Sequence, residues 1–267
     1  KITTQRKLNE EPDAKSFQPF AEKNETTAIY TRRTDIDIRL AEQRPQVYDQ
    51  MLTIDGQDLV TDIDYDIING VPDDTGYGLR GLEDRVPISN TGYDVNNGAA
   101  LVINTSDTTF KTFLKLFRKA KDKIKLSRGM TLVAFCNESV EQAVSSGRDL
   151  LGANVVGYDV ANIIDQRVTT IDGVPLVKLR ADSIGTDLLP FDENSESSTS
   201  IWICGIGGAP GEGSMELPNG MVILSSDEII RRRTNQTLTQ IQTMQEIDVG
   251  LRTPPGSVVR LSRLKVA

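Results

Sequence analysis

Histidine is missing from all 267 residues of the sequence. A Ser-His-Asp triad, a Cys-His pair and a histidine-ligated metal site are therefore excluded. Only two cysteines are present, Cys136 and Cys204, and each lies in an apolar, strand-like run. We expect two buried free thiols rather than a disulfide framework, which favours a reducing compartment.

Long hydrophobic runs are missing as well. No stretch approaches the roughly 20 apolar residues that cross a bilayer, and the first 30 residues are too polar for a signal peptide. Aromatic residues make up only 5% of the chain, which disfavours a sugar-binding cleft built on stacking platforms. Nothing singles out a catalytic pair among the 38 acidic residues. We predict no enzyme activity, no catalytic residue, no cofactor and no membrane partner.

Positive charge is outweighed by negative charge. The chain has 30 basic and 38 acidic residues and a net charge of −8, so a chain-wide basic footprint for tight nucleic-acid binding is lacking. Basic residues concentrate at 111–125 and at Arg231–Arg233. These segments could be solvated faces, contacts for an acidic loop of a neighbouring subunit, or weak contacts to phosphates.

The order of the predicted elements is typical of an α+β fold rather than a repeating βαβ sheet. Residues 1–28 show no sustained period and are interpreted as an extended arm, where Phe17 and Phe20 either anchor on a neighbour or belong to a frayed terminus. Alternating residues at 29–40 predict a strand. Residues 53–98 are rich in Asp, Gly and Asn and predict a long, irregular β excursion.

The clearest helix is predicted over 106–128. Ser106 and Asp107 are suited to cap its start and Gly129 to follow its end. Apolar residues recur at helical spacing and basic residues occupy the other face, so we expect an amphipathic helix. The apolar members are Phe110, Phe113, Leu114, Phe117, Ala120 and Ile124, and the basic members are Lys111, Lys115, Arg118, Lys119, Lys123 and Lys125.

A mixed region follows this helix. Residues 131–135 predict a buried strand, and Asn137 predicts the cap of a second helix that ends near Leu151. A short helical turn is predicted at 160–164. Asp172-Gly173 lies between two strand-like runs and favours a hairpin with a type I′ turn.

The remaining segments predict strands and loops. Residues 192–199 are interpreted as a polar linker or surface loop, and 201–206 and 221–224 as strands. The glycine-rich run 205–213 is interpreted as a loop rather than a nucleotide site, because it lacks the helix start and Gly-Lys-Ser/Thr that phosphate binding requires. Residues 258–266 predict a last strand with a kink.

An acidic stretch, Asp62-Ile-Asp64-Tyr-Asp66, matches the first half of a calcium-binding loop. Its sixth position is Ile67 instead of glycine, and its twelfth is Asp73 instead of the usual glutamate. A solvated acidic loop is therefore the favoured interpretation, and we predict no metal site.

The element order resembles that of a known protein family. The run from Thr108 to Val144 resembles the spine helix of phage major capsid proteins with its exit strand, and 168–179 (VTTIDGVPLVKL) is similar to a hairpin of the same proteins. Residues 198–208 and 248–266 resemble their later strands. Together these segments indicate the major coat protein of a tailed bacteriophage, with the α+β fold of the Hong Kong 97 type, over residues 86–267.

The resemblance implies a peripheral domain with a long spine helix, an axial domain, and an N-terminal arm and extended β loop that reach over adjacent subunits. The implied parts are an N-terminal arm at 1–28, the extended β loop and start of the peripheral domain at 29–100, the spine helix at 101–128, the axial domain at 129–225 and a return to the peripheral domain at 226–267.

The function implied is that of a structural subunit that self-assembles into an icosahedral shell around double-stranded DNA. Its partners would be other copies in hexamers and pentamers, scaffold and portal proteins, and packaged DNA through weak, non-specific contact. Assembly would take place in the host bacterial cytoplasm and the subunit would reside in the virion capsid. The alternatives are a soluble binding or capsid-decoration protein and a shell subunit of a bacterial nanocompartment.

The charge pattern predicts one contact between subunits, in which the acidic excursion of one copy lies against the basic helix face of a neighbour. Exposed ion pairs contribute only ~0.2–1 kcal/mol each, so this contact would set register more than strength. The predicted contact residues are Phe17 and Phe20 of the arm, Asp62, Asp64 and Asp66 of the excursion, and Lys111, Lys115 and Lys119 of the helix.

Overall fold

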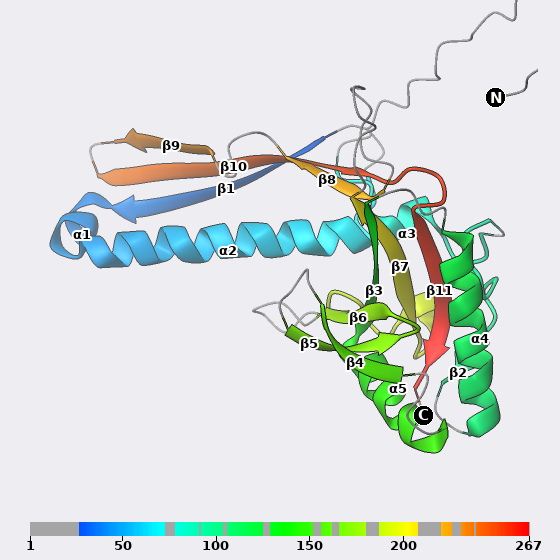
Figure 1. The fold of residues 1–267 in the computed structure, drawn as a ribbon. Coiled ribbons are helices and arrows are strands. Elements are labelled where there is room, and N and C mark those ends of the chain that lie inside the picture. Colours follow the sequence, from blue (N-terminus) through cyan, green and yellow to red (C-terminus); the bar gives the residue numbers. More distant parts are fainter. Residues whose placement is uncertain are drawn as a thin grey trace, which may run out of the picture.

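A computed structural model describes most of the chain. The described residues are 27–72, 78–90, 92–103, 106–124, 129–151, 156–161, 166–179, 187–207, 220–225, 231–237 and 239–266. They form a mixed α and β structure in which an elongated lobe projects from a more compact body (Figure 1). These two parts are termed the long lobe and the body below.

The long lobe is built on an antiparallel sheet. Its central strand is β10 (Gln240–Arg252), which pairs with β1 (Ala28–Asp37) along one edge. β9 (Arg231–Gln236) and β8 (Val222–Ser225) pair with successive parts of the other edge. Side chains alternate between the two faces, so one face of β1 is buried while the other, from Ile29 onward, is exposed.

Two helices complete the long lobe. α1 (Ile38–Gln43) lies at its tip, and α2 (Pro45–Asn69) runs back along the sheet towards the body (Figure 1). Pro45 suits the first turn of a helix, where its missing N–H needs no partner. The buried residues of α2 are Leu52, Leu59, Ile63 and Ile68.

The predicted β excursion at 53–98 is therefore wrong as far as Asn69, because this part of the chain is helical. Aspartate and glycine have low helix propensity, and α2 contains six aspartates and one glycine. Packing on a sheet, rather than propensity, stabilises such a helix. The predicted strand at 29–40 is confirmed up to Asp37, where the chain enters α1.

The body contains a seven-stranded sheet in the order β2-β11-β7-β3-β6-β5-β4. Its centre is formed by β3 (Met130–Asn137), β7 (Thr199–Gly207) and β11 (Val258–Lys265), which run antiparallel to their neighbours within this group. The outer strands are β2 (Leu101–Val102), β4 (Val156–Ala161), β5 (Gln166–Ile171) and β6 (Val174–Leu179). The short helix α3 (Leu82–Arg85) lies where the body meets the long lobe (Figure 1).

Two amphipathic helices pack on this sheet, and both were predicted. α4 (Asp107–Lys123) begins at Ser106, whose side chain and that of Thr109 form a reciprocal capping box. Phe110, Phe113 and Phe117 are fully buried against the sheet and α5 (Glu138–Leu151). The predicted cap of α5 is confirmed, since the Ser139 N–H donates to Asn137 Oδ1 at 2.9 Å.

Two local predictions in the body are confirmed by backbone geometry. Asp172 and Gly173 have φ values of 49° and 78°, as a type I′ turn between β5 and β6 requires. The kink in the last strand appears as a register shift between Leu261 and Leu264, with Arg263 at φ 52°.

One other local prediction is wrong: Val160 and Ala161 pair with β5 as part of strand β4, so no helical turn begins there. Of the two interpretations of 192–199, the surface loop is confirmed, since Asp192, Ser195 and Ser197 are exposed. The loop is not solvated throughout, because the Glu193 side chain is only 7% exposed and pairs with a buried arginine. The predicted arm, with Phe17 and Phe20, and most of the glycine-rich loop lie outside the described residues. The five domain boundaries stay predictions.

The long lobe and the body share a hydrophobic cluster. Trp202 of β7 and Val258 of β11 pack together with Leu59 of α2 and Leu251 of β10. Because residues of both the long lobe and the body form this cluster, it fixes how the two parts meet. It also anchors the ends of α2 and β10 to the body sheet.

A buried arginine completes this junction. Arg260 of β11 is 1% exposed, and its guanidinium lies 4.7 Å from the ring centre of Trp202. It donates to Ser200 Oγ at 2.8 Å, to the Val86 carbonyl at 3.0 Å and to the carboxylates of Glu83 and Glu193. One side chain thus joins β11, β7, α3 and the loop before β7.

Candidate inter-subunit surfaces

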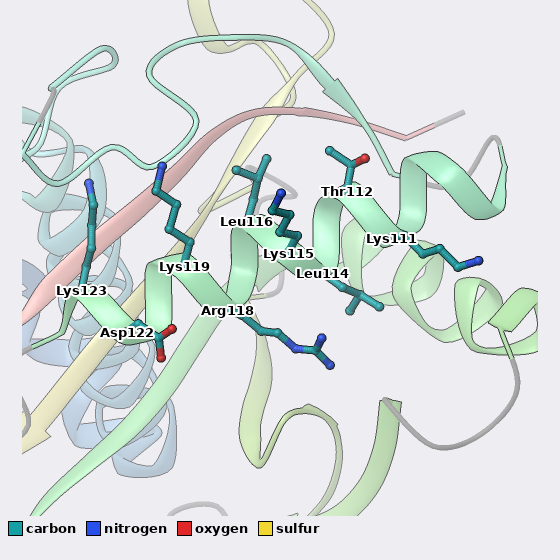
Figure 2. A pocket seen from close by; sticks show the side chains of 9 residues that line it. All are labelled: Lys111, Thr112, Leu114, Lys115, Leu116, Arg118, Lys119, Asp122 and Lys123. Atoms are coloured by element: carbon teal, nitrogen blue, oxygen red, sulfur yellow. The ribbon is translucent and has the colours of Figure 1, made fainter.

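The first candidate surface is the solvent-facing side of α4. This helix carries six basic side chains and two aspartates, and Lys111, Lys115 and Lys119 lie opposite the buried phenylalanines. Figure 2 shows Lys115, Leu116, Lys119 and Lys123 projecting from one side of the helix, where they border an open surface hollow. The sequence prediction of a basic helix face is confirmed.

Part of this basic face is already engaged within the chain. Arg118 makes two hydrogen bonds to the Asp172 carboxylate, at 2.5 and 3.2 Å, and Lys121 Nζ donates to the Asp172 carbonyl at 2.6 Å. The hydrogen bond from Arg118 lowers the pKa of Asp172. These contacts hold the tip of the β5–β6 hairpin on α4.

Two of the predicted contact lysines remain available. Lys111 lies 3.5 Å from Asp107 one turn earlier, a weak exposed pair. Lys115 and Lys119 form no ion pair or hydrogen bond with any described part of the chain. Their charges therefore face solvent in the single subunit, on either side of the half-buried Leu116.

The second candidate surface is α2, which carries six aspartates and no lysine or arginine. Three of these carboxylates surround Arg32 of β1: Asp55 at 3.7 Å, Asp58 at 2.9 Å and Asp62 at 3.4 Å. One positive charge against three negative charges leaves this edge of the helix negative. The acidic segment that was predicted as a loop is therefore part of a helix.

The other predicted contact aspartates lie on different sides of α2. Asp66 accepts a 2.7 Å hydrogen bond from the Tyr30 hydroxyl. The pKa of Tyr30 is raised, chiefly because the hydroxyl is partly buried and secondly because of this hydrogen bond. Asp64 is exposed. Residues two positions apart do not share a face of a helix, so Asp62, Asp64 and Asp66 cannot converge as the first half of a calcium loop does.

The structure does not bring the acidic and basic sets together within one chain. α2 extends from one side of the body and α4 lies on the opposite side (Figure 1). A contact between these helices therefore requires two copies. Whether Asp62, Asp64 and Asp66 contact Lys111, Lys115 and Lys119 of a neighbour stays a prediction.

Exposed hydrophobic residues form a third feature, which sequence patterns did not reveal. Among the described residues, large hydrophobic side chains that are exposed lie on the long lobe or, for Val71, directly after α2. In α4, α5 and the body sheet, the large hydrophobic side chains whose burial is described are buried or half-buried. The exposed set is Ile29, Leu40, Met51, Ile54, Val60, Tyr65, Val71, Ile223 and Met244. These residues come from the sheet, from α1 and from α2 or directly after it, and exposed apolar side chains that gather on one face are candidates for contact with another molecule.

The cysteines, candidate metal ligands and helices of the described residues bear on the sequence predictions. Cys136 and Cys204 are free and fully buried, as predicted, and burial raises the pKa of Cys136 to about 12. Within the described ranges, no set of acidic and thiol side chains is arranged to hold a metal ion. No helix among these residues is long and apolar enough to cross a membrane.

Comparisons with known proteins place the fold. No family model matches the sequence, and no curated protein matches it. Solved structures do match. A chain of the SrpI encapsulin complex of Synechococcus elongatus PCC 7942 aligns with a TM-score of 0.63 and 13% identity, over 90% of this chain and 74% of that one.

Two further matches are particles of phage or phage-like type. A chain of the satellite phage P4 procapsid aligns with a TM-score of 0.52 and 12% identity, over 100% of this chain and 86% of that one. A chain of the capsid of an empty GTA particle aligns with a TM-score of 0.50 and 12% identity, over 90% of this chain and 74% of that one. The chain has the Hong Kong 97-type fold of phage capsid proteins and encapsulins, as its sequence predicted.

Proposed function

We propose that this protein is the structural subunit of a closed icosahedral shell, the major capsid protein of a tailed phage. The main support is the match of nearly the whole chain to shell-forming proteins. Exposed hydrophobic residues on a projecting lobe support the same role, because each subunit of a shell buries several different surfaces against its neighbours. The role is structural rather than catalytic.

The partners proposed are chiefly other copies of the chain, in hexamers and pentamers. Scaffold and portal proteins and packaged double-stranded DNA are further proposed partners. The net charge of −8 favours a shell wall that does not grip DNA tightly. Assembly in the bacterial cytoplasm and residence in the virion capsid belong to the same proposal.

Within this shell, we propose that α2, rather than the predicted helix at 101–128, serves as the spine helix of the peripheral domain. α2 has 25 residues against 17 in α4. It also packs along the sheet whose central strand, β10, comes from the end of the chain. A domain built on a long helix and a sheet from the chain's end is what the resemblance implies.

Electrostatic contact between copies is tested by charge reversal. The double variant Lys115→Glu/Lys119→Glu places two negative charges where the proposed contact needs positive ones, and assembly should weaken. Lys178→Glu/Arg80→Glu is a matched control with the same change in net charge, at exposed pairs elsewhere. Normal particle yield from the Lys115/Lys119 variant would rule out the contact.

The shell itself is tested by negative-stain microscopy and size-exclusion chromatography of the purified chain, with and without a co-expressed scaffold protein. Closed or partial shells tens of nanometres across are the expected result. A subunit that stays monomeric under both conditions would refute the proposal. It would instead favour the soluble binding or decoration protein.

A second candidate is the shell of a bacterial nanocompartment, favoured by the TM-score of 0.63 to an encapsulin. Such a shell encloses protein cargo instead of a genome. Particles isolated from cells that produce this protein natively distinguish the two. Nuclease-protected double-stranded DNA inside them supports the capsid, whereas an enclosed protein without protected DNA supports the nanocompartment.

A further inference from the structure

One side of α2 carries a stripe of mostly apolar side chains that the described part of the chain leaves partly exposed. Its members recur at spacings of three, four or seven residues, so they share one face of the helix. Met51, Ile54 and Tyr65 are 37%, 55% and 39% exposed. Asp58, four residues after Ile54 and seven before Tyr65, lies within this face, and Asp62 lies at its edge; both pair with Arg32 of β1. The stripe is Val47, Met51, Ile54, Thr61 and Tyr65, of which Thr61 is polar and Val47 and Thr61 are half-buried.

The solvent side of α4 has the complementary composition. Leu116 is its half-buried apolar centre, and Lys115 and Lys119 beside it carry charges without a partner in the described structure. The stripe of α2 spans about 27 Å and α4 about 25 Å at 1.5 Å per residue. The stripe of the acidic helix and the whole of the basic helix therefore match in length, and they can pack with leucine against isoleucine and methionine.

We propose that the stripe of α2 in one copy docks on the solvent side of α4 in a second copy. This inference rests on the proposed shell function and names the partner of both surfaces. Apolar contact supplies most of the attraction, and Lys115 and Lys119 approach Asp58 within the stripe and Asp62 at its edge. The sequence analysis predicted the charge pairing between the two segments. The apolar centre of the contact, formed by Met51, Ile54 and Leu116, was not part of that prediction.

The uncovered face of the long-lobe sheet is a weaker partner for α2. Its arginines are already neutralised within the chain, since Arg33 pairs with Asp35 and Arg231 with Asp248. Arg233 likewise pairs with Glu246. Lys115 and Lys119 of α4 have no such partner, so α4 is the better electrostatic match.

The proposed contact is head-to-tail. α2 and α4 lie on opposite sides of the body (Figure 1), so a copy that offers α2 to one neighbour offers α4 to another. Such heterologous contacts form rings when the rotation between copies closes. An isologous contact, in which α2 meets α2, would stop at a dimer.

Cysteine cross-linking tests both the contact and its direction. Ile54→Cys and Leu116→Cys are made singly and together in the full chain, and each is oxidised under conditions of assembly. The native cysteines need no replacement because both are fully buried. The two single variants, mixed, should give a disulfide-linked dimer that neither gives alone. The double variant should give a ladder of dimers, trimers and larger species on a non-reducing gel.

A matched control replaces Leu116→Cys by Lys178→Cys, an exposed position on β6 outside the proposed contact. Cross-linking of this control as readily as the test pair would overturn the inference, because it would show random collision. A dimer from Ile54→Cys alone would also overturn it in favour of an isologous contact.

Electron microscopy of the same samples separates this inference from the proposed function. Shells that form without the ladder refute the α2–α4 contact and leave the shell function standing. A ladder in samples that never form shells supports the contact and refutes the shell. The absence of both refutes both.

Discussion

Replacement of Arg260 by methionine should destabilise the subunit severely, because a buried charge loses its partner. Methionine fills much of the same space beside Trp202 but cannot donate a hydrogen bond. Glu193, whose side chain is 7% exposed, loses the guanidinium, and the Val86 carbonyl and Ser200 lose a donor. Glu83 is 44% exposed and can be solvated by water instead.

The magnitude follows from these contacts. Removing one partner of a buried ion pair costs about 3–5 kcal/mol. Glu193 keeps two donors, the Ser200 hydroxyl and the Arg263 N–H, so the lower end applies. We expect a loss of about 3 kcal/mol in the free energy of unfolding, which shifts the urea midpoint down by about 1 M for an m-value of about 3 kcal/mol/M.

Urea unfolding of the unassembled subunit measures this loss. The chain has a single tryptophan, and Trp202 lies directly beside Arg260, so its fluorescence reports on this junction. Arg80→Met, at an exposed ion pair, is the control and should change stability by less than about 0.5 kcal/mol.

A double-mutant cycle with Glu193→Gln separates the charge from the packing. A neutral glutamine no longer needs the guanidinium, so the double variant should be more stable than the sum of the two losses by about 1 kcal/mol or more. Additive losses would refute the buried-pair explanation, as would a midpoint shift for Arg260→Met below about 0.3 M.

Three further outcomes are expected. Gly147→Ala should destabilise the body by about 1–3 kcal/mol despite alanine's helix propensity, because the new methyl group would overlap the buried Phe110 ring; a more stable variant in thermal unfolding would contradict this. Cys136 and Cys204 should both resist iodoacetamide at about pH 8, because both are fully buried and burial raises the pKa of each thiol, and both should react together only on unfolding. The hydrogen bond from Lys265 is the main cause that lowers the pKa of Glu196 to about 2. A carboxyl group with a lowered pKa stabilises the fold at pH values above its ordinary pKa of about 4.5, and this stabilisation is lost as the pH falls towards 2. The difference in stability between wild type and Glu196→Gln should therefore vanish between about pH 4.5 and pH 2 in an acid titration. A difference that stays constant over this range would contradict the prediction.

The elements that sequence reasoning predicted are those whose stabilising signals are local. α4 has a capping residue, three phenylalanines at helical spacing and a continuous basic face, all within 17 residues. The turn at Asp172-Gly173 needs only two residues that tolerate positive φ. Both signals survive in the folded chain because packing reinforces them.

α2 could not be predicted in the same way. Its aspartates suggest a loop. In the folded chain Arg32 offsets their negative charge, and Arg32 lies on a strand some 20 to 30 residues earlier. The sheet that buries Leu52 and Leu59 depends on β10, nearly 200 residues later in the chain. Pairings this distant leave no periodic trace in a single segment.

The candidate surfaces show the same division. The exposure of Lys115 and Lys119 follows from the helical period of α4 and was predicted. That of Met51 and Ile54 depends on which face of α2 the distant sheet covers, and so had no sequence signal. The burial of Glu193 likewise had no sequence signal, because its neighbours are polar and its partner, Arg260, lies 67 residues later.

The strength of the proposed contact fits the needs of shell assembly. Fully burying one large apolar side chain contributes about 1.5–3 kcal/mol, and Met51, Ile54 and Tyr65 are each about 40–55% exposed, so one contact gains about 2–4 kcal/mol. That corresponds to millimolar affinity or weaker, and two dilute subunits would not stay together. In a closed ring each subunit makes this contact twice, and a further contact within the same particle is intramolecular and therefore much stronger in effect. Weak, repeated contacts let a wrongly placed subunit dissociate before the shell closes, whereas a single strong contact would trap it.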